Sequence, residues 1–197
     1  MAEDESLEGL YEKLNKELAK IELWFLSNHL TIHPGKCKYT LFSSKDAPGP
    51  LKIMGKDIER VDKFKLVGLV IDQNLNFSEH VSQVRAKVSA ALSMIARSKR
   101  NLPMDVRKLL FNALIQSQIQ YAISIWGGTT KSILDPLIKL QKKALRIVVK
   151  AKWISHCEPL WNKVGGCKLK DLYELGCTKI AYKITKGTAL ALSLIHI

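Results

Sequence analysis

Apolar positions follow a helical spacing at two places along the chain, near its start and again after about residue 76. Shorter, strand-like patterns lie between them. Between residues 5 and 26 they recur every three or four residues, which predicts an amphipathic helix. Ser6 suits the N-cap of that helix, because its hydroxyl oxygen can accept a hydrogen bond from a backbone N–H of the first turn. After residue 77 the helical spacing returns and continues to about residue 186.

Short strands are predicted between these two helical regions. Tyr39 to Phe42 forms one strand, and residues 51–54 and 58–61 alternate apolar and polar positions around a glycine, which is typical of a hairpin. Phe64 to Ile71 is mostly apolar and predicts a single, largely buried strand. Gly68 interrupts that strand, and a glycine there indicates a bulge or the close approach of another backbone or a ligand.

Four amphipathic helices are predicted in the second part of the chain. The first spans residues 78–97, with one face made of Val81, Val84, Val88, Leu92 and Ile95. The second begins at Pro103, and its buried face is expected to consist of Val106, Leu109, Leu110, Ala113 and Leu114. The third and fourth cover about 132–150 and 169–186. The pattern therefore predicts an α+β fold, in which a short antiparallel hairpin and other strands precede a helical bundle.

The charge of the chain points to a class of partner. The sequence holds 31 basic and 18 acidic side chains, a net charge of +13. Residues 1–24 contain seven acidic residues and three lysines and sum to −4, so the remainder carries +17. A basic excess of this size is typical of a protein that binds a polyanion, with nucleic acid favoured over an anionic membrane surface. The alternative is a solvated basic surface without a partner.

The four cysteines indicate structural thiols more than a metal site. Zinc ligands usually come in close pairs, and no such pair occurs among Cys37, Cys157, Cys167 and Cys177. We therefore expect buried, reduced thiols and no metal. The sequence also has no secretory signal and no apolar run of the roughly 18 residues that would span a membrane. These features predict an intracellular protein without a membrane segment.

Several local motifs occur in a recognisable order. They are Leu14-Asn15 to Trp24, Asn28 to Lys38 with Tyr39-Thr40-Leu41-Phe42, Phe64-Lys65-Leu66-Val67-Gly68, Gln120 to Gly127, and Leu140 to Arg146. Together they resemble the C-terminal part of the reverse transcriptase of non-LTR (LINE-like, jockey-type) retrotransposons, from about residue 7 to residue 186. The second stretch resembles polymerase motif D, and the third resembles the primer grip. The sequence departs from the family pattern at His33, Cys37 and Phe77, where the family has Asn, Thr and Trp.

This resemblance implies roles for residues in the first part of the chain. Lys36 is the motif D lysine, a catalytic residue close to the phosphates of the incoming nucleotide; the alternative is an ordinary loop lysine. Phe64, Leu66 and Gly68 form the primer grip. In that role the glycine lets the backbone approach the primer, and the two apolar side chains anchor the hairpin in the core. The alternative is a purely structural hairpin.

The resemblance also implies that the basic helices are a thumb that straddles the template–primer duplex. Its contacts are to phosphates and do not depend on sequence. The candidates are Arg85, Lys87, Arg97, Lys99, Arg100, Arg107, Lys108, Lys142, Lys143 and Arg146. Each of them taken singly could instead be a solvated charge. His80, Trp126 and Gln141 are interpreted as structural contacts between helices.

The implied organisation is that of a polymerase fragment. Residues 1–76 are a partial palm with motif D and the primer-grip hairpin, residues 77–150 are the helical thumb, and residues 151–190 are a helical C-terminal extension. Residues 191–197 read like a translated sequencing adapter. The start falls just past the place where the family has its catalytic hairpin, so the upstream palm and fingers are expected to be missing. The parent element would act in the cytoplasm and the nucleus.

The aromatic-x-Asp-Asp box that holds Mg²⁺ in the parent enzyme does not occur in this sequence. Two-metal phosphoryl transfer needs clustered carboxylates, and the adjacent acids Glu3-Asp4-Glu5 precede the first helix with no strand to hold them. We therefore expect a fragment that binds an RNA template–DNA primer duplex, has no cofactor of its own and does not polymerise alone. The alternatives are a stand-alone basic helical module that binds nucleic acid and a maturase-like thumb.

Overall fold

The structure is a computed structural model that describes residues 6–43 and 48–187, and it confirms the α+β fold class. The chain divides into two compact units, Met1–Leu75 and Asn76–Ile197. The tail at residues 191–197 and the acidic leader lie outside the described residues. The assignment of the chain to palm, thumb and extension is a statement about function, and it stays a prediction.

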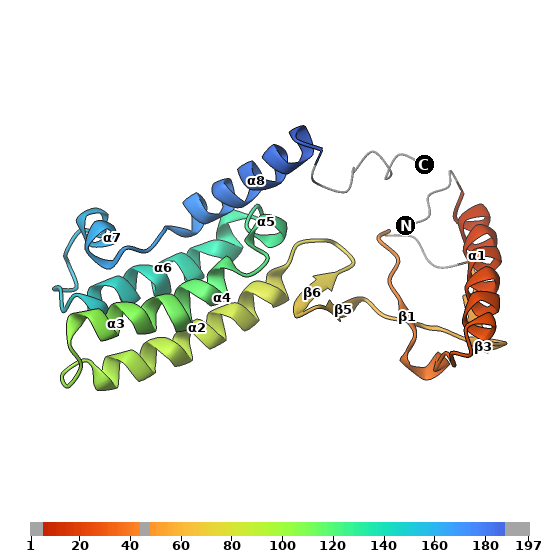
Figure 1. Cartoon of the computed structure of the whole chain (residues 1–197), viewed down its shortest axis with the longest axis horizontal. Coiled ribbons are helices and arrows are strands. Elements are labelled where there is room, and N and C mark those ends of the chain that lie inside the picture. Colours follow the sequence, from red (N-terminus) through yellow and green to blue (C-terminus); the bar gives the residue numbers. More distant parts are fainter. Residues whose placement is uncertain (1–5, 44–47, 188–197) are drawn as a thin grey trace. The chain divides into compact units, whose positions relative to one another are not determined.

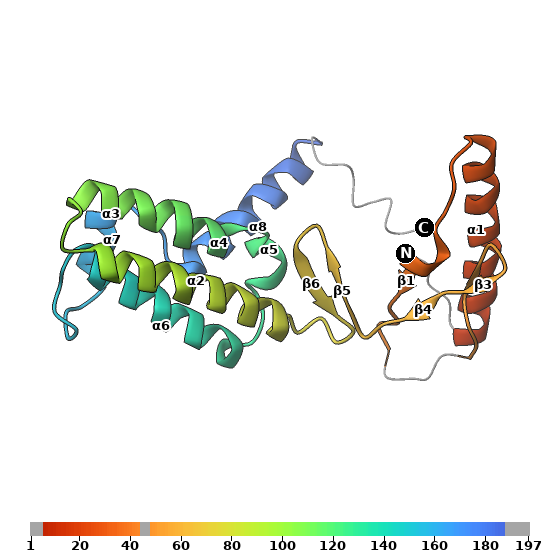
Figure 2. The same cartoon turned by 90° about the horizontal axis from the view of Figure 1, so that it is seen from below.

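Helix α1 (Leu7–Ser27) begins as predicted, with the Ser6 hydroxyl accepting a hydrogen bond from Gly9 N at 3.0 Å. Its Tyr11 is buried in a small core with Leu51, Ile53 and Ile58. The Tyr11 hydroxyl donates to the Tyr39 hydroxyl at 3.3 Å, and burial is the main cause that raises the pKa of Tyr11 to about 12. These contacts hold α1 against the strands of its own unit, shown in Figure 2.

The strands of the first unit pair two by two. A 3₁₀ turn, η1 (Pro34–Lys36), precedes β1 (Lys38–Tyr39), which pairs in parallel with β4 (Glu59–Arg60). Strand β2 (Lys52–Ile53) is antiparallel to β3 (Lys56–Asp57), and β5 (Lys63–Leu66) is antiparallel to β6 (Leu69–Asp72).

Two of the strand predictions were wrong in their pairing. Residues 64–71 do not form a single buried strand, because the chain reverses at Val67-Gly68, whose φ angles are 46° and 85°. Two consecutive positive φ angles are what a type I′ turn requires, and this turn matches the twist of paired strands. Gly68 therefore marks a hairpin turn, not a bulge. In the other predicted hairpin the turn falls at Met54-Gly55, and Glu59–Arg60 pairs with β1 instead of β2.

The second unit is a helical bundle, as predicted. Helices α2 (Ser78–Ser98) and α6 (Lys131–Val148) pack against each other. Figures 1 and 2 show α3 (Met104–Phe111) and α4 (Ser117–Gln120) running alongside them. The predicted face of α2 is confirmed, because Val81, Val84, Val88, Leu92 and Ile95 are all buried.

Three further helices lie in the described part of this unit. Helix α5 (Ile123–Trp126) contacts α8 (Leu169–Thr185), and α7 (Glu158–Val164), which was not predicted, contacts α6. Figure 1 shows that the C-terminal end of α8 extends beyond the bundle, in agreement with the exposure of residues 178–187.

The buried face of α3 and α4 is not the one predicted. Val106 and Leu109 are 38% and 66% exposed, whereas Phe111, Ile115 and Ile119 are completely buried. A π-helical turn, η2 (Asn112–Gln116), joins the two helices and shifts the phase of the residues that follow it. In addition, the polar residues Arg107 and Gln116 lie in the buried stripe, so a search for apolar positions misses it.

Candidate nucleic-acid interface

Four lysines of the first unit lie around one cavity, which we call the lysine cavity. Its volume is about 490 Å³, and it is lined by Lys36, Lys38, Thr40, Phe42, Val61, Lys63, Phe64 and Lys65. Lys36 ends η1, and Phe64 lies between two of the lysines on β5. The fold thus brings together two predicted site residues from separate sequence motifs.

The other predicted primer-grip residues do not line the lysine cavity. Leu66 is 55% exposed and Phe64 is half-buried, so the prediction that both side chains anchor the hairpin in the core was wrong for Leu66. Gly68 lies in the turn between β5 and β6. Within the cavity lining, Lys38 forms an ion pair with Glu59 at 2.9 Å across the β1–β4 pair, while Lys36 is exposed.

A second basic cavity, which we call the α2–α6 cavity, lies in the helical unit. Its volume is about 380 Å³, and it is lined by Lys99, Arg100, Lys143, Arg146, Ile147, Lys150, Ala151 and Trp153. The first two follow the end of α2, and the next three belong to the C-terminal half of α6. Four of the predicted phosphate contacts meet here, and this lining, drawn from the described residues, contains no acidic side chain.

Trp153 is the aromatic wall of the α2–α6 cavity. The Cζ atom of Arg146 lies 5.5 Å from the centroid of the indole, within the range of a cation–π contact. Arg146 Nε also donates to the Ser155 carbonyl at 3.1 Å, which ties the loop after α6 back to the helix. Neither Trp153 nor Lys150 was predicted as a site residue. The available signal was a tryptophan a few residues beyond a basic helix.

Most of the remaining predicted contacts are exposed but lie outside this cavity. Arg85, Lys87, Arg97 and Lys142 are on solvent-facing positions of α2 and α6. Lys108 forms an ion pair with Asp105 at 3.5 Å, in the first turns of α3.

Arg107 was predicted as a phosphate contact, and its environment contradicts that role. The residue is only 4% exposed. Its Nε donates to the Val148 carbonyl at 2.7 Å, and its Nη1 donates to the carbonyls of Lys99 and Leu102 at 3.0 and 2.8 Å. These acceptors lie at or beyond helix ends, where carbonyls lack helical partners, so Arg107 is a structural cap for α2 and α6.

Three polar or aromatic residues of the bundle have the structural role that was predicted. The ring of buried His80 lies 5.6 Å from the ring of Trp126, centroid to centroid. Gln141 Nε2 donates to the Cys167 carbonyl at 3.0 Å, and its Oε1 accepts from Leu169 N at 3.2 Å. Burial, followed by the charge of Lys87, lowers the pKa of His80 from its ordinary value.

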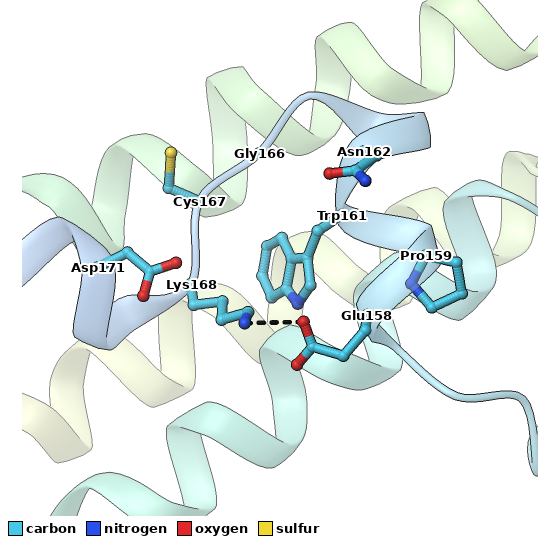
Figure 3. A pocket seen from close by; sticks show the side chains of 8 residues that line it. All are labelled: Glu158, Pro159, Trp161, Asn162, Gly166, Cys167, Lys168 and Asp171. Atoms are coloured by element: carbon cyan, nitrogen blue, oxygen red, sulfur yellow. Dashed lines mark ion pairs between the residues drawn. The ribbon is translucent and has the colours of Figure 1, made fainter.

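A third cavity, of about 410 Å³, lies between α7 and the start of α8, and its lining contains an ion pair. Figure 3 shows Lys168 and Glu158 joined by an ion pair of 2.8 Å beside the ring of Trp161. The hydrogen bond with Glu158 raises the pKa of Lys168. Because Glu158 cancels the charge of Lys168 and the lining also contains Asp171, this cavity is a weaker candidate for a polyanion site than the α2–α6 cavity.

The thiols differ from the prediction in their exposure. All four cysteines are unpaired, and Cys167 is exposed while the other three are partly exposed, so they are not buried. Within the described ranges, no group of three or more His, Cys, Asp or Glu side chains could hold a metal ion. No helix in the same ranges has the length and apolar character that a membrane span requires.

Comparison with known proteins finds similarity to polymerases of mobile elements. The chain is 23% identical over 148 residues to the RNA-directed DNA polymerase from mobile element jockey of Drosophila funebris, a match that covers 72% of this chain and 16% of that protein. For the jockey polymerase of Drosophila melanogaster the identity is 23% over 163 residues, covering 80% and 18%. For the probable RNA-directed DNA polymerase from transposon X-element of the same species it is 22% over 134 residues.

No family model and no solved structure matches the chain. The chain spans less than a fifth of the length of these curated relatives. The matches nevertheless extend over two thirds or more of this chain in both jockey polymerases. By sequence, therefore, the chain is a distant homologue of the reverse transcriptases of non-LTR retrotransposons.

Proposed function

We propose that the chain is the duplex-binding part of an RNA-directed DNA polymerase of a non-LTR retrotransposon. In this proposal residues 1–76 belong to the palm and contact the primer, residues 77–150 are the thumb, and residues 151–190 extend it. The observation that carries the proposal is the α2–α6 cavity, where five basic side chains from α6 and from the segments that follow α2 and α6 surround one space without an acidic neighbour in its lining.

The chemistry of this cavity suits the backbone of nucleic acid. Lysine and arginine bind phosphates with the release of condensed counterions, so such binding is independent of sequence and weakens steeply with salt. A polymerase must move along its template–primer duplex, and contacts that do not read bases allow this movement. Arg85, Lys87, Arg97 and Lys142 are further exposed candidates for phosphate contacts.

The lysine cavity supports a role for the first unit near a phosphate or a primer end. Lys36 and Phe64 line the same space, and Lys65 adds a further exposed charge. A lysine in this place would neutralise negative charge on a nucleotide or on the primer backbone, which is the role proposed for Lys36.

The parent polymerase would use Mg²⁺, and the described residues do not supply a site for it. Two-metal catalysis needs carboxylates that converge on shared ions, and the described ranges hold no cluster of three potential ligands. We therefore assign no step of nucleotidyl transfer to this chain.

The proposal is tested by measuring the affinity of the chain for an RNA–DNA hybrid duplex between about 50 and 200 mM salt. The double variant Lys99→Glu/Lys143→Glu should bind at least about tenfold more weakly and lower the slope of log K against log salt by about 2. The matched control is Lys13→Glu/Lys16→Glu, which changes the net charge equally on exposed positions of α1.

Affinity that does not depend on salt, or an equal loss in both double variants, would contradict the proposal. The coding sequence upstream of the Met1 codon tests the parent activity separately. An in-frame aromatic-x-Asp-Asp box there supports the polymerase, and an in-frame stop codon supports a stand-alone nucleic-acid-binding module.

A further inference from the structure

The α2–α6 cavity contains a feature that duplex binding through phosphates leaves unexplained. Trp153 is 72% exposed, although a tryptophan side chain is among the most favourable to bury. The other tryptophans of the same unit, Trp126 and Trp161, are 0% and 7% exposed. A large aromatic surface is thus held in solvent next to five cations.

The indole contacts Arg146, and the loop that carries it is tied to α6. The guanidinium of Arg146 covers one face of the indole. The same guanidinium donates to the carbonyl of Ser155, two residues after Trp153, and so ties the loop back to α6. Since one face contacts the guanidinium and most of the residue is exposed, the remaining aromatic surface is available to a ligand.

The backbone beside Trp153 is also held in an unusual conformation. Helix α6 ends in a Schellman arrangement, with Ala151 N donating to the Arg146 carbonyl at 2.9 Å and Lys150 N donating to the Ile147 carbonyl at 3.3 Å. Lys150 therefore occupies the left-handed position, with φ 56°, that glycine usually takes. A lysine in the left-handed conformation costs free energy, yet Lys150 places a cation in the lining of the cavity. This combination suggests a function for the cation.

We propose that the α2–α6 cavity binds an unpaired nucleotide of single-stranded nucleic acid, whose base stacks on Trp153. The neighbouring phosphates would contact Lys99, Arg100, Lys143 and Lys150. Stacking on an aromatic side chain within a basic groove holds single strands without reading their sequence, because every base has a π face. A paired base inside a duplex cannot stack in this way, so the site selects the strand beyond the end of the duplex.

This proposal names the ligand of the α2–α6 cavity more closely than the proposed function does. It depends on the proposed function only in taking the ligand to be a polyanion. The test compares two probes on the whole chain at one salt concentration: an oligothymidylate of about 12 nucleotides, and a blunt RNA–DNA hybrid. Trp153→Ala should lower the affinity for the single strand by about tenfold and change the affinity for the blunt hybrid by less than about twofold. Trp153→Phe, which keeps an aromatic face, should recover most of the loss.

A matched control is available in the first unit. Trp24 is also exposed, at 57%, but lies on the acidic α1, so Trp24→Ala should leave both affinities unchanged. If Trp153→Ala leaves single-strand affinity unchanged, or weakens both probes equally, the stacking site is wrong while salt-dependent hybrid binding still supports the proposed function. If the wild-type chain binds neither probe, the proposed function itself fails.

Discussion

Arg107 and Arg146 both lie on basic helices, yet their guanidinium groups have different partners. Arg107 donates to three backbone carbonyls inside the bundle, whereas Arg146 faces Trp153 at the edge of a cavity. Their sequence surroundings are alike, so periodicity and charge predicted one role for both. What separates them is the partners that each one meets in the folded chain: helix-end carbonyls for Arg107, one of them 41 positions away, and the loop after α6 for Arg146.

At this scale we expect Arg107→Ala to lower the free energy of unfolding of the second unit by about 2–4 kcal/mol. The variant removes the donor from one buried carbonyl at the end of α6 and from two partly buried carbonyls after α2. Urea unfolding followed by circular dichroism measures the change. Arg85→Ala, on an exposed position of α2, should remain within about 0.5 kcal/mol of the wild type. If both variants changed the free energy of unfolding equally, the capping role of Arg107 would be contradicted.

Lys150 allows a test that separates stability from binding. Lys150→Gly should raise the free energy of unfolding by up to about 1 kcal/mol, because glycine adopts the left-handed conformation without steric cost. The same variant should weaken nucleic-acid binding, since it removes a cation from the α2–α6 cavity. The matched control is Gly165→Ala at the end of α7, where φ is 75° and nothing lies within 4 Å, so it should destabilise through the backbone alone. A Lys150→Gly variant that binds as tightly as the wild type would argue against a contact at this residue.

Among the elements, the long helices could be predicted, whereas the pairing of the short strands could not. The boundaries of α1, α2, α6 and α8 agree with their periodicity to within a few residues. The strands are two to four residues long, too short for alternation to identify a partner, so β4 was paired with the wrong strand. The π turn was likewise invisible, because no residue type specifies an extra residue in a helical turn.

The β5–β6 hairpin carries a strained residue in its turn. Val67 has φ 46° and is 82% exposed, and a β-branched residue is unfavourable there. We expect Val67→Asn to stabilise the hairpin by about 1 kcal/mol, which would appear as slower amide hydrogen exchange in β5 and β6. Met54→Asn changes the corresponding position of the β2–β3 turn and should slow exchange only there. Unchanged exchange in both hairpins would show that the turn residues do not limit their opening.

Helix α2 contributes a pH dependence through His80. Burial lowers the pKa of His80 in the folded chain, so the unfolded chain binds the proton more readily. The second unit should therefore have its full stability above about pH 6.5 and lose part of it as the pH falls through the folded pKa. Urea unfolding at about pH 7.5 and 5.5 measures this loss, and His80→Phe should reduce it. His156→Phe, at an exposed position, is the control that should retain it.

Across the whole molecule, the prediction was accurate for the broad organisation and incomplete for the sites. The change from strands to basic helices near residue 76 was visible in the spacing of apolar residues. The α2–α6 cavity was only partly visible, because Lys99 and Trp153 are more than fifty positions apart and meet through the packing of α2 on α6. A site assembled from such distant segments depends on tertiary packing that a local pattern does not contain.

The two units should unfold separately, because they differ in core size. The first unit has a small core around Tyr11 and an apolar cavity of about 880 Å³ between α1 and the strands. A unit that buries so little apolar surface is marginally stable, so we expect it to unfold at a lower urea concentration than the helical bundle. Fluorescence of exposed Trp24 should change first and that of buried Trp126 later, with Trp24→Phe removing the first change. A single transition seen by both probes would contradict this expectation.

The π turn at Asn112–Gln116 has a consequence for how the coding sequence can drift. A π turn holds one residue more than an α-helical turn, so the loss of one codon here would convert it to a regular α-helical turn and keep the rotation of α4 that buries Ile119. Substitutions at exposed positions such as Asn112 or Ala113 leave that rotation unchanged. In a lineage that accumulates mutations, point changes and single-codon deletions should both persist in this segment, while single-codon deletions within the regular helices α2 and α6 should be eliminated wherever the bundle is still under selection.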